Sequence, residues 1–137
     1  MEETNIYPKV TKDFNLLLVI VLNLAIINSL VKIFQTVVSV IMNVHEWTDF
    51  EVLHALIAGL IHCVLLGYFL WKKDKIGYYI VMAYQIINGL ILSFATGEFI
   101  INLSVSLFFI VLINLLLLLR KKGKSGFKTI FEGLIVR

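Results

Sequence analysis

Cysteine, proline and charged residues are all scarce in this sequence. A single cysteine, Cys63, excludes an internal disulfide framework and a cysteine-cluster metal site. The only proline, Pro8, lies in the polar segment 1–13, which we expect to be a cytoplasmic tail. Charged residues make up 15% of the 137 residues, whereas soluble domains have about 25%. This composition excludes a soluble enzyme, a disordered chain and a nucleic-acid-binding domain.

What the sequence has in abundance is apolar residues. They make up 60% of the chain, and the mean hydropathy is +0.95. A water-soluble globule of this size would leave large apolar patches on its surface. The composition therefore predicts a small polytopic membrane protein, with the lipid bilayer as its principal partner.

Four long apolar segments follow one another along the chain. Because a helix rises about 1.5 Å per residue, roughly 20 residues cross a hydrocarbon core of about 30 Å. Short links make successive helices antiparallel neighbours. The predicted fold is an all-α integral membrane protein, an up-down-up-down bundle of four transmembrane helices with a short C-terminal amphipathic helix. The transmembrane domain is 14–119, and its spans are 14–44, 51–71, 76–96 and 99–119.

Basic residues fall on one side of this arrangement. Of the 12 Lys and Arg, all except Lys32 lie in segment 1–13, in the link 72–75 or in segment 120–137. The other two links contain acidic residues and no Lys or Arg. The positive-inside rule then predicts a multi-pass protein of the plasma (inner) membrane with both termini in the cytoplasm.

The first apolar segment carries polar residues on one helical face. At 100° per residue they fall within an arc of about 120°. This face predicts the lining of a cavity or pore, completed by copies of the same chain. Two structural alternatives are an amphipathic extension at the outer surface and hydrogen bonding between helices. Besides Ser29, the lining candidates are Asn28, Lys32, Gln35, Thr36, Ser39 and Asn43.

The first segment is also too long for a simple span. A 31-residue helix is about 46 Å long and would need a tilt beyond the usual range. In one interpretation the span runs from residue 14 to 34, Lys32 approaches the outer interface, and residues 35–44 project outward. In the other, a kinked or tilted helix leaves Lys32 near mid-membrane, level with His62.

Small residues recur on the second and third segments. Such ridges let another helix approach closely, so we expect them to be packing features. The tightest contact of the second segment is expected around Gly59, with the third segment or with a second copy. The predicted packing residues are Ala55, Gly59, Cys63 and Gly67 on the second segment, and Gly89 and Ser93 on the third.

A further set of polar residues lies inside the last three segments. Counted from the helix ends, Tyr84, Gln85, His62 and Asn114 fall at similar depths, which predicts a mid-membrane polar layer. One functional interpretation is a proton-linked or solute pathway through His62, and the alternative is hydrogen bonding between helices. The candidates are His54, His62, Tyr84, Gln85, Asn88 and Asn114.

Cofactor and catalytic signals are weak. A b-type haem needs two histidines from facing helices, which this chain could supply only as a dimer or through His45. The pair Glu51 and His54 has the spacing of a di-iron helix, but that motif must occur twice. No intramembrane carboxylate pair, Ser/His/Asp set or glycine-rich phosphate loop is present. We therefore expect no enzyme, no bound metal and no cofactor.

The C-terminal segment 120–137 combines a basic cluster with an apolar helical face. The face comprises Phe127, Ile130, Phe131, Leu134 and Ile135, with Ser125 as its N-cap. It predicts a short helix on the inner leaflet or, alternatively, a docking element for a cytoplasmic protein. The residues expected to bind anionic inner-leaflet lipids are Arg120, Lys121, Lys122, Lys124 and Lys128.

Together these patterns lead to one functional hypothesis with two alternatives. The hypothesis is a homo-oligomeric channel or conduit for ions or small solutes, lined by the polar face of the first segment. The first alternative is a non-transporting adaptor, immunity or regulatory subunit whose basic tail binds a cytoplasmic partner. The second is a haem-binding electron-transfer subunit.

Overall fold

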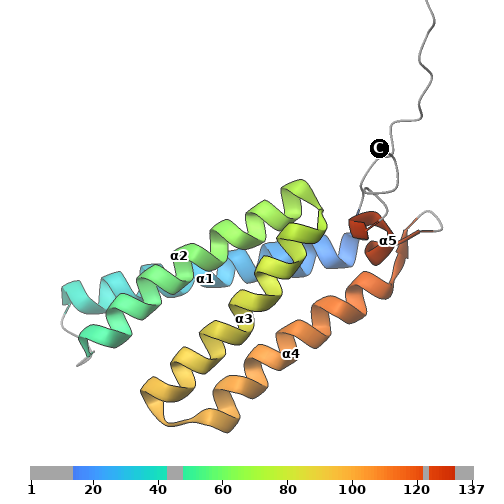
Figure 1. The fold of residues 1–137 in the computed structure, drawn as a ribbon. Helices are drawn as coiled ribbons and strands as arrows, with labels where there is room; N and C mark the ends of the chain where they lie inside the picture. The colour runs from blue at the N-terminus through green and yellow to red at the C-terminus, as the bar shows by residue number, and fades with distance from the viewer. Residues whose placement is uncertain (1–13, 43–47, 122–123, 132–137) are drawn as a thin grey trace, which may run out of the picture.

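The computed structural model describes residues 14–42, 48–121 and 124–131 (Figure 1). Over these ranges the chain is helical apart from one two-residue β-ladder. The helices are α1 (Leu16–Met42), α2 (Asp49–Lys72), α3 (Lys75–Thr96), α4 (Phe99–Leu118) and α5 (Gly126–Phe131), and β1 (Arg120–Lys121) pairs antiparallel with β2 (Lys124–Ser125).

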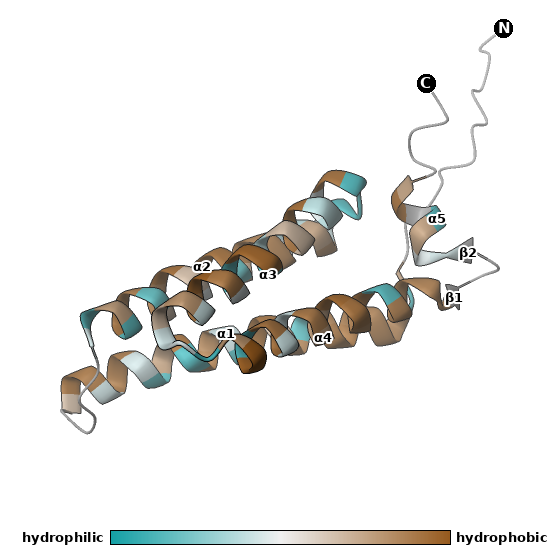
Figure 2. Cartoon of the chain, turned by 60° about the horizontal axis from the view of Figure 1, so that its bottom comes forward, coloured by the Kyte–Doolittle hydropathy of each residue, from teal (hydrophilic) through white to brown (hydrophobic). Residues whose placement is uncertain are grey.

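The first four helices are long and apolar enough to cross a membrane, as the sequence predicts. Their ends agree with the predicted spans to within two residues wherever the structure describes them. The two final residues of the first predicted span, 43 and 44, lie outside the described residues. Figure 2 shows apolar residues covering most of the four helices, with hydrophilic positions on α1 and near the helix ends.

Capping residues explain where the helices begin and end. Thr48 accepts a hydrogen bond from the Glu51 backbone, and the Glu51 carboxylate accepts one from the Thr48 backbone, which together form a capping box. Asp74 caps α3 through the Gly77 backbone at 2.7 Å. Gly97 ends α3 at φ +73°, a left-handed conformation that glycine adopts without strain. Glu51 therefore takes part in the N-terminal cap of α2.

The four long helices form two pairs. Figure 1 shows α1 beside α2 and α3 beside α4, with α2 and α3 connecting the pairs through a short link. The two pairs lie close together near α5 and diverge toward their far ends. α1 reaches α4 near the α5 end, where Asn15 Nδ2 donates to the Leu116 carbonyl at 2.6 Å. The far half of the molecule is consequently the open half.

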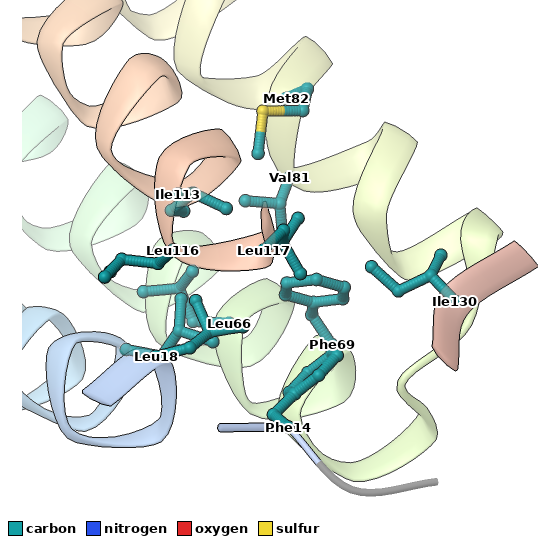
Figure 3. Packing of buried hydrophobic residues seen from close by; sticks show 11 residues of the cluster. Phe14, Leu18, Leu66, Phe69, Val81, Met82, Ile113, Leu116, Leu117 and Ile130 are labelled. Atoms are coloured by element: carbon teal, nitrogen blue, oxygen red, sulfur yellow. The ribbon is translucent and has the colours of Figure 1, made fainter. Parts of the chain in front are cut away.

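The buried apolar core gathers at the α5 end of the molecule (Figure 3). Phe14 and Phe69 both belong to this core, with ring centroids 5.2 Å apart. No more than 28% of the residues of any apolar span are buried. Most of the apolar surface of the spans is therefore available to lipid or to further copies of the chain. The core comprises Phe14, Leu18, Leu22, Leu66, Phe69, Val81, Met82, Ile113, Leu116, Leu117 and Ile130.

The small residues mark the close helix contacts. A Cβ added at Gly59 would lie 2.8 Å from the Ile33 side chain, so this site packs against α1 rather than α3. On the same side, Cys63 Sγ lies 3.7 Å from the Ile26 carbonyl of α1. Ala55 is half-buried. Our expectation that this ridge contacts the third segment or a second copy was therefore wrong.

α3 and α4 approach each other closely at Gly89. A Cβ there would lie 2.9 Å from the Ser106 Cβ and still closer to its hydroxyl oxygen. Ser93, one turn further along α3, is fully buried and donates to the Gly89 carbonyl at 2.7 Å. At Gly67, by contrast, a Cβ would meet no heavy atom within 4 Å.

These two glycines provide a matched test of the helix contacts. Gly89→Ala should destabilise the protein by about 1–3 kcal/mol, because α3 and α4 must separate to admit the methyl group. Gly67→Ala should be neutral or slightly stabilising, since alanine favours helix and the site is open. Unfolding of both variants in mixed detergent micelles measures the difference. Equal stability of the two variants would contradict the close approach at Gly89.

The C-terminal segment folds back onto the chain's own helices. Gly126 packs against Leu117 of α4, and Ile130 is only 1% exposed within the core. The rings of Phe127 and Phe131 both lie edge-on to Tyr78 of α3, with centroids 6.1 Å away. Ser125 accepts from the Lys128 backbone, as predicted for an N-cap.

The described part of the apolar face of α5 therefore packs on α3 and α4 of the same chain, a contact that the sequence analysis did not predict. The antiparallel pairing of β1 with β2 brings the start of α5 back beside the end of α4. Leu134 and Ile135, predicted to extend this face, lie outside the described residues, as does Lys122. Arg120 and Lys121 form β1, Lys124 begins β2, and Lys128 is exposed on α5.

Replacing Phe127, Ile130 and Phe131 together with serine should release α5 from its contacts with the other helices. The three side chains supply the apolar contacts of this helix, whereas the other core residues belong to α1–α4. Limited trypsin cleavage at Lys128, carried out in detergent micelles without lipid, should accelerate at least about tenfold. The helical content of the protein should fall only slightly. An unchanged cleavage rate would show that these contacts do not hold α5 in place.

Candidate functional site

A chain of hydrogen bonds crosses three helices near their midpoints. His62 of α2 lies between Ser29 of α1 and Gln85 of α3. Its Nδ1 is 2.9 Å from the Ser29 hydroxyl oxygen, and its Nε2 is 2.7 Å from the Gln85 amide nitrogen. Ser29 and Gln85 are both buried, at 6% exposure. We call these three residues the central network.

The hydrogen bonds of the central network run in one direction. The Gln85 amide nitrogen can only donate, so His62 Nε2 accepts. A neutral imidazole then carries its proton on Nδ1, which donates to Ser29 Oγ. The Ser29 hydroxyl in turn donates to the Ala25 carbonyl at 3.1 Å. All the polar groups of the His62 ring are thereby satisfied without water.

Aromatic rings enclose the imidazole of His62. The Tyr84 ring stacks on it with centroids 5.6 Å apart, and the Phe109 ring lies edge-on at 5.7 Å. The Tyr84 hydroxyl donates to the Ala58 carbonyl at 2.5 Å, which fixes the ring against α2. The middle of a single chain is consequently filled by side chains from all four long helices.

Two other predicted polar residues belong to separate pairs. On the open half, His54 Nε2 lies 3.0 Å from the Asn88 amide oxygen, which joins α2 to α3. Toward the core, the Tyr78 hydroxyl donates to the Asn114 amide oxygen at 2.7 Å, which joins α3 to α4. Asn114 was predicted to share the layer of His62; its contacts with α3 are to Tyr78 and to Met82, whose sulfur lies 3.9 Å from Asn114 Nδ2. Its partner Tyr78 is about two helical turns along α3 from Gln85.

The polar face of α1 divides into a buried part and an exposed part. Ser29 and Thr36 are buried, and Thr36 donates to the Lys32 carbonyl at 2.9 Å. Asn28, Lys32 and Gln35 are exposed at i, i+4 and i+7, so they lie along one side of the helix. Ser39 is half-buried, and Asn43 lies outside the described residues. We call Asn28, Lys32 and Gln35 the exposed polar row.

The central network also locates Lys32 along the bundle. Because Ser29 is level with His62, Lys32 lies about 4.5 Å further along the α1 axis. α1 is a single helix from Leu16 to Met42. Lys32 therefore lies in the middle third of α1.

Sequence reasoning identified most members of the central network but not how they pair. His62, Gln85 and Tyr84 were grouped by depth, whereas Ser29 was considered only as part of the polar face of α1. The sequence feature that could have placed Ser29 beside His62 is the small-residue ridge at Gly59 and Cys63. This ridge brings α1 close enough for a serine hydroxyl to reach the imidazole.

Metal and haem ligation find little support at these histidines. Within the part of the chain that the structure describes, no three His, Cys, Asp or Glu side chains gather as a metal site. Both ring nitrogens of His62 have partners, so an iron atom would have to displace Ser29 or Gln85. Comparisons of this chain with protein-family models, curated proteins and solved structures find no match. Any function must therefore be argued from the geometry alone.

Proposed function

We propose that the four long helices cross the membrane in antiparallel succession, with both termini in the cytoplasm. Several copies of the chain then assemble so that the exposed polar row of α1 lines a water-filled path for ions or small solutes. The positive-inside distribution of Lys and Arg supports this orientation. The observation that carries the proposal is the exposed polar row near the middle of α1.

The cost of exposing this row to lipid supports an assembly. A lysine at the centre of a membrane helix costs about 2.5–3.5 kcal/mol on insertion scales. The Lys32 ammonium makes no ion pair with the described residues, and the adjacent Asn28 and Gln35 side chains are exposed as well. Water or the polar groups of another copy would remove this cost.

The packing of a single chain indicates that the path lies between copies. The middle of one chain is occupied by the central network and by the rings of Tyr84 and Phe109. A ring of copies, by contrast, can place one row from each copy around a common axis. The Lys32 ammonium groups would then form a ring of positive charge, which favours anions.

Two measurements on the purified chain test this proposal. Its mass in mild detergent should be a multiple of the 15.6 kDa chain mass. In liposomes it should conduct chloride faster than potassium. A monomer without flux contradicts the proposal, and so does an oligomer without flux, since the row would then be a packing surface.

A further inference from the structure

Two basic segments that are far apart in the sequence meet at one end of the molecule. One is the short link between α2 and α3, and the other is the C-terminal segment that contains α5. α5 packs beside the first turns of α3 (Figure 1), where the Phe131 ring lies 6.1 Å from the rings of Tyr78 and Tyr79. We call four lysines from the link and from α5 the basic cluster, which comprises Lys72, Lys73, Lys75 and Lys128.

Few carboxylates oppose the charge of the basic cluster. Among the described residues at this end of the helices, the only carboxylate is that of Asp74. Its Oδ1 accepts from the Gly77 backbone at 2.7 Å, and its Oδ2 accepts from the Tyr68 hydroxyl at 3.5 Å. This end of the described chain is therefore net positive. The other described carboxylates lie at the opposite ends of the helices and belong to Asp49, Glu51 and Glu98.

The backbone at Lys73 is an unusual place for a lysine. Lys73 ends α2 at φ 49° and ψ 43°, in the left-handed region. A Cβ crowds the neighbouring carbonyl in this conformation, so glycine is the common choice for such a cap. The corresponding residue at the end of α3 is indeed glycine, Gly97. The lysine side chain is thus present at a cost to the backbone, which points to a role beyond the helix cap.

Exposed aromatic residues place the basic cluster at the level of the lipid headgroups. Trp71 is 75% exposed and Tyr79 is 58% exposed, and the Lys72 ammonium lies 4.4 Å from the centre of the Trp71 ring. Trp and Tyr are enriched at the boundary between hydrocarbon and headgroups. α2 and α3, with 24 and 22 residues, are just long enough for their ends to reach this boundary. At this level the anions nearest to the lysines are lipid phosphates.

We propose that the basic cluster binds anionic phospholipids in the leaflet on its side of the membrane. The lysine ammonium groups hold the lipid phosphates, and the rings of Trp71 and Tyr79 lie against the glycerol region. The sequence predicts this contact for segment 120–137 alone, whereas the folded chain adds the link between α2 and α3. The inference rests on the proposed crossing of the membrane by α2 and α3, but not on ion conduction or on assembly.

Quenching of Trp71 fluorescence by brominated lipids tests the proposal. Trp47→Phe leaves Trp71 as the only tryptophan. The protein is reconstituted in two bilayers of identical composition, equal parts of phosphatidylglycerol and phosphatidylcholine, which differ only in which lipid carries bromine. Because both bilayers have the same surface charge, a difference in quenching reports which lipid lies beside Trp71. We expect phosphatidylglycerol to be favoured at least about threefold.

Variants of two lysines separate lipid binding from folding. Lys73→Gly should reduce the preference to less than about twofold. It should not lower stability in mixed detergent micelles, because glycine relieves the left-handed cap. Lys73→Arg should keep the preference, since it keeps the charge. Lys128→Gln changes an exposed side chain and should also reduce the preference, because α5 brings Lys128 to the same end as Trp71. If Lys73→Gly is less stable than the parent, Lys128→Gln decides the question.

A tryptophan at the opposite end of the helices is the matched control. Phe99, the first residue of α4, is 42% exposed. It is replaced with tryptophan in a chain in which Trp47 and Trp71 are both phenylalanine. This probe should be quenched equally by the two lipids.

Three results would overturn the proposal. One is equal quenching of Trp71 by the two lipids, which would leave the lysines as a surface for a soluble partner. Another is the same preference at position 99, which would make it a property of the whole bilayer surface. The third is an unchanged preference in both Lys73→Gly and Lys128→Gln. A failure to conduct ions affects none of these measurements, whereas no quenching by either lipid would contradict the membrane crossing and this inference with it.

Discussion

Replacing Lys32 with glutamate is expected to reverse the ion preference of the reconstituted protein from anions to cations. Lys32 is exposed near the middle of α1, with the amides of Asn28 and Gln35 on the same side of this helix. In an assembly of copies, each chain would then contribute a negative charge where it had contributed a positive one. The ratio of chloride to potassium permeability should fall by at least about tenfold, which is about 1.4 kcal/mol of selectivity.

The reversal potential across liposomes in a potassium chloride gradient measures this change. Lys72→Glu is the matched control, since it makes the same change of net charge at the exposed end of α2. The control should leave the sign of the preference unchanged. Lys32→Met should give an intermediate value, because it removes the charge but keeps the length of the stem. If Lys32→Glu conducts with the original preference, Lys32 does not line the path.

Removing His62 is expected to have the largest effect on stability. His62→Leu breaks two hydrogen bonds at once and leaves the buried Gln85 amide without its partner. An unsatisfied buried amide costs about 1–3 kcal/mol, so unfolding in mixed detergent micelles should become easier by about that amount or more. Ser29 contributes less to the loss, because its hydroxyl still donates to the Ala25 carbonyl.

The double variant His62→Leu with Gln85→Leu distinguishes this cause from simple loss of packing. With both partners apolar, no polar group of the pair is left buried, so the double variant should regain at least half of the lost stability. His54→Leu serves as a comparison and should cost less, because His54 and Asn88 are only half-buried. A double variant less stable than His62→Leu would show that Gln85 has another role in the fold.

The four long helices could be predicted from the sequence because apolar run length and helical rise are local properties. The exposure of Lys32 and the burial of Ser29 could not, because both depend on which side of α1 faces α2. That orientation is fixed by the contact of Gly59 with Ile33. A small-residue ridge identifies one face of a helix but does not identify the partner helix.

The remaining differences have a similar origin. Depth counted from helix ends grouped Asn114 with His62, whereas the side chains that contact Asn114 from α3 are Tyr78 and Met82. The C-terminal segment was predicted to lie on lipid because it has an apolar face, and such a face does not identify the surface on which it packs. In the structure, the antiparallel pairing of β1 with β2 precedes α5, and Ile130 of α5 packs in the apolar core.

Water access at position 32 tests the central claim most directly. A single cysteine is placed at Lys32, or at its neighbour Val31, in a Cys63→Ala background, and each protein is reconstituted in liposomes. Val31 is 45% exposed, lies at nearly the same depth and points 100° away around α1. A charged, membrane-impermeant thiol reagent should modify position 32 rapidly and position 31 at least about tenfold more slowly. If position 32 is as unreactive as position 31, no water reaches the exposed polar row, and it does not line a conduit.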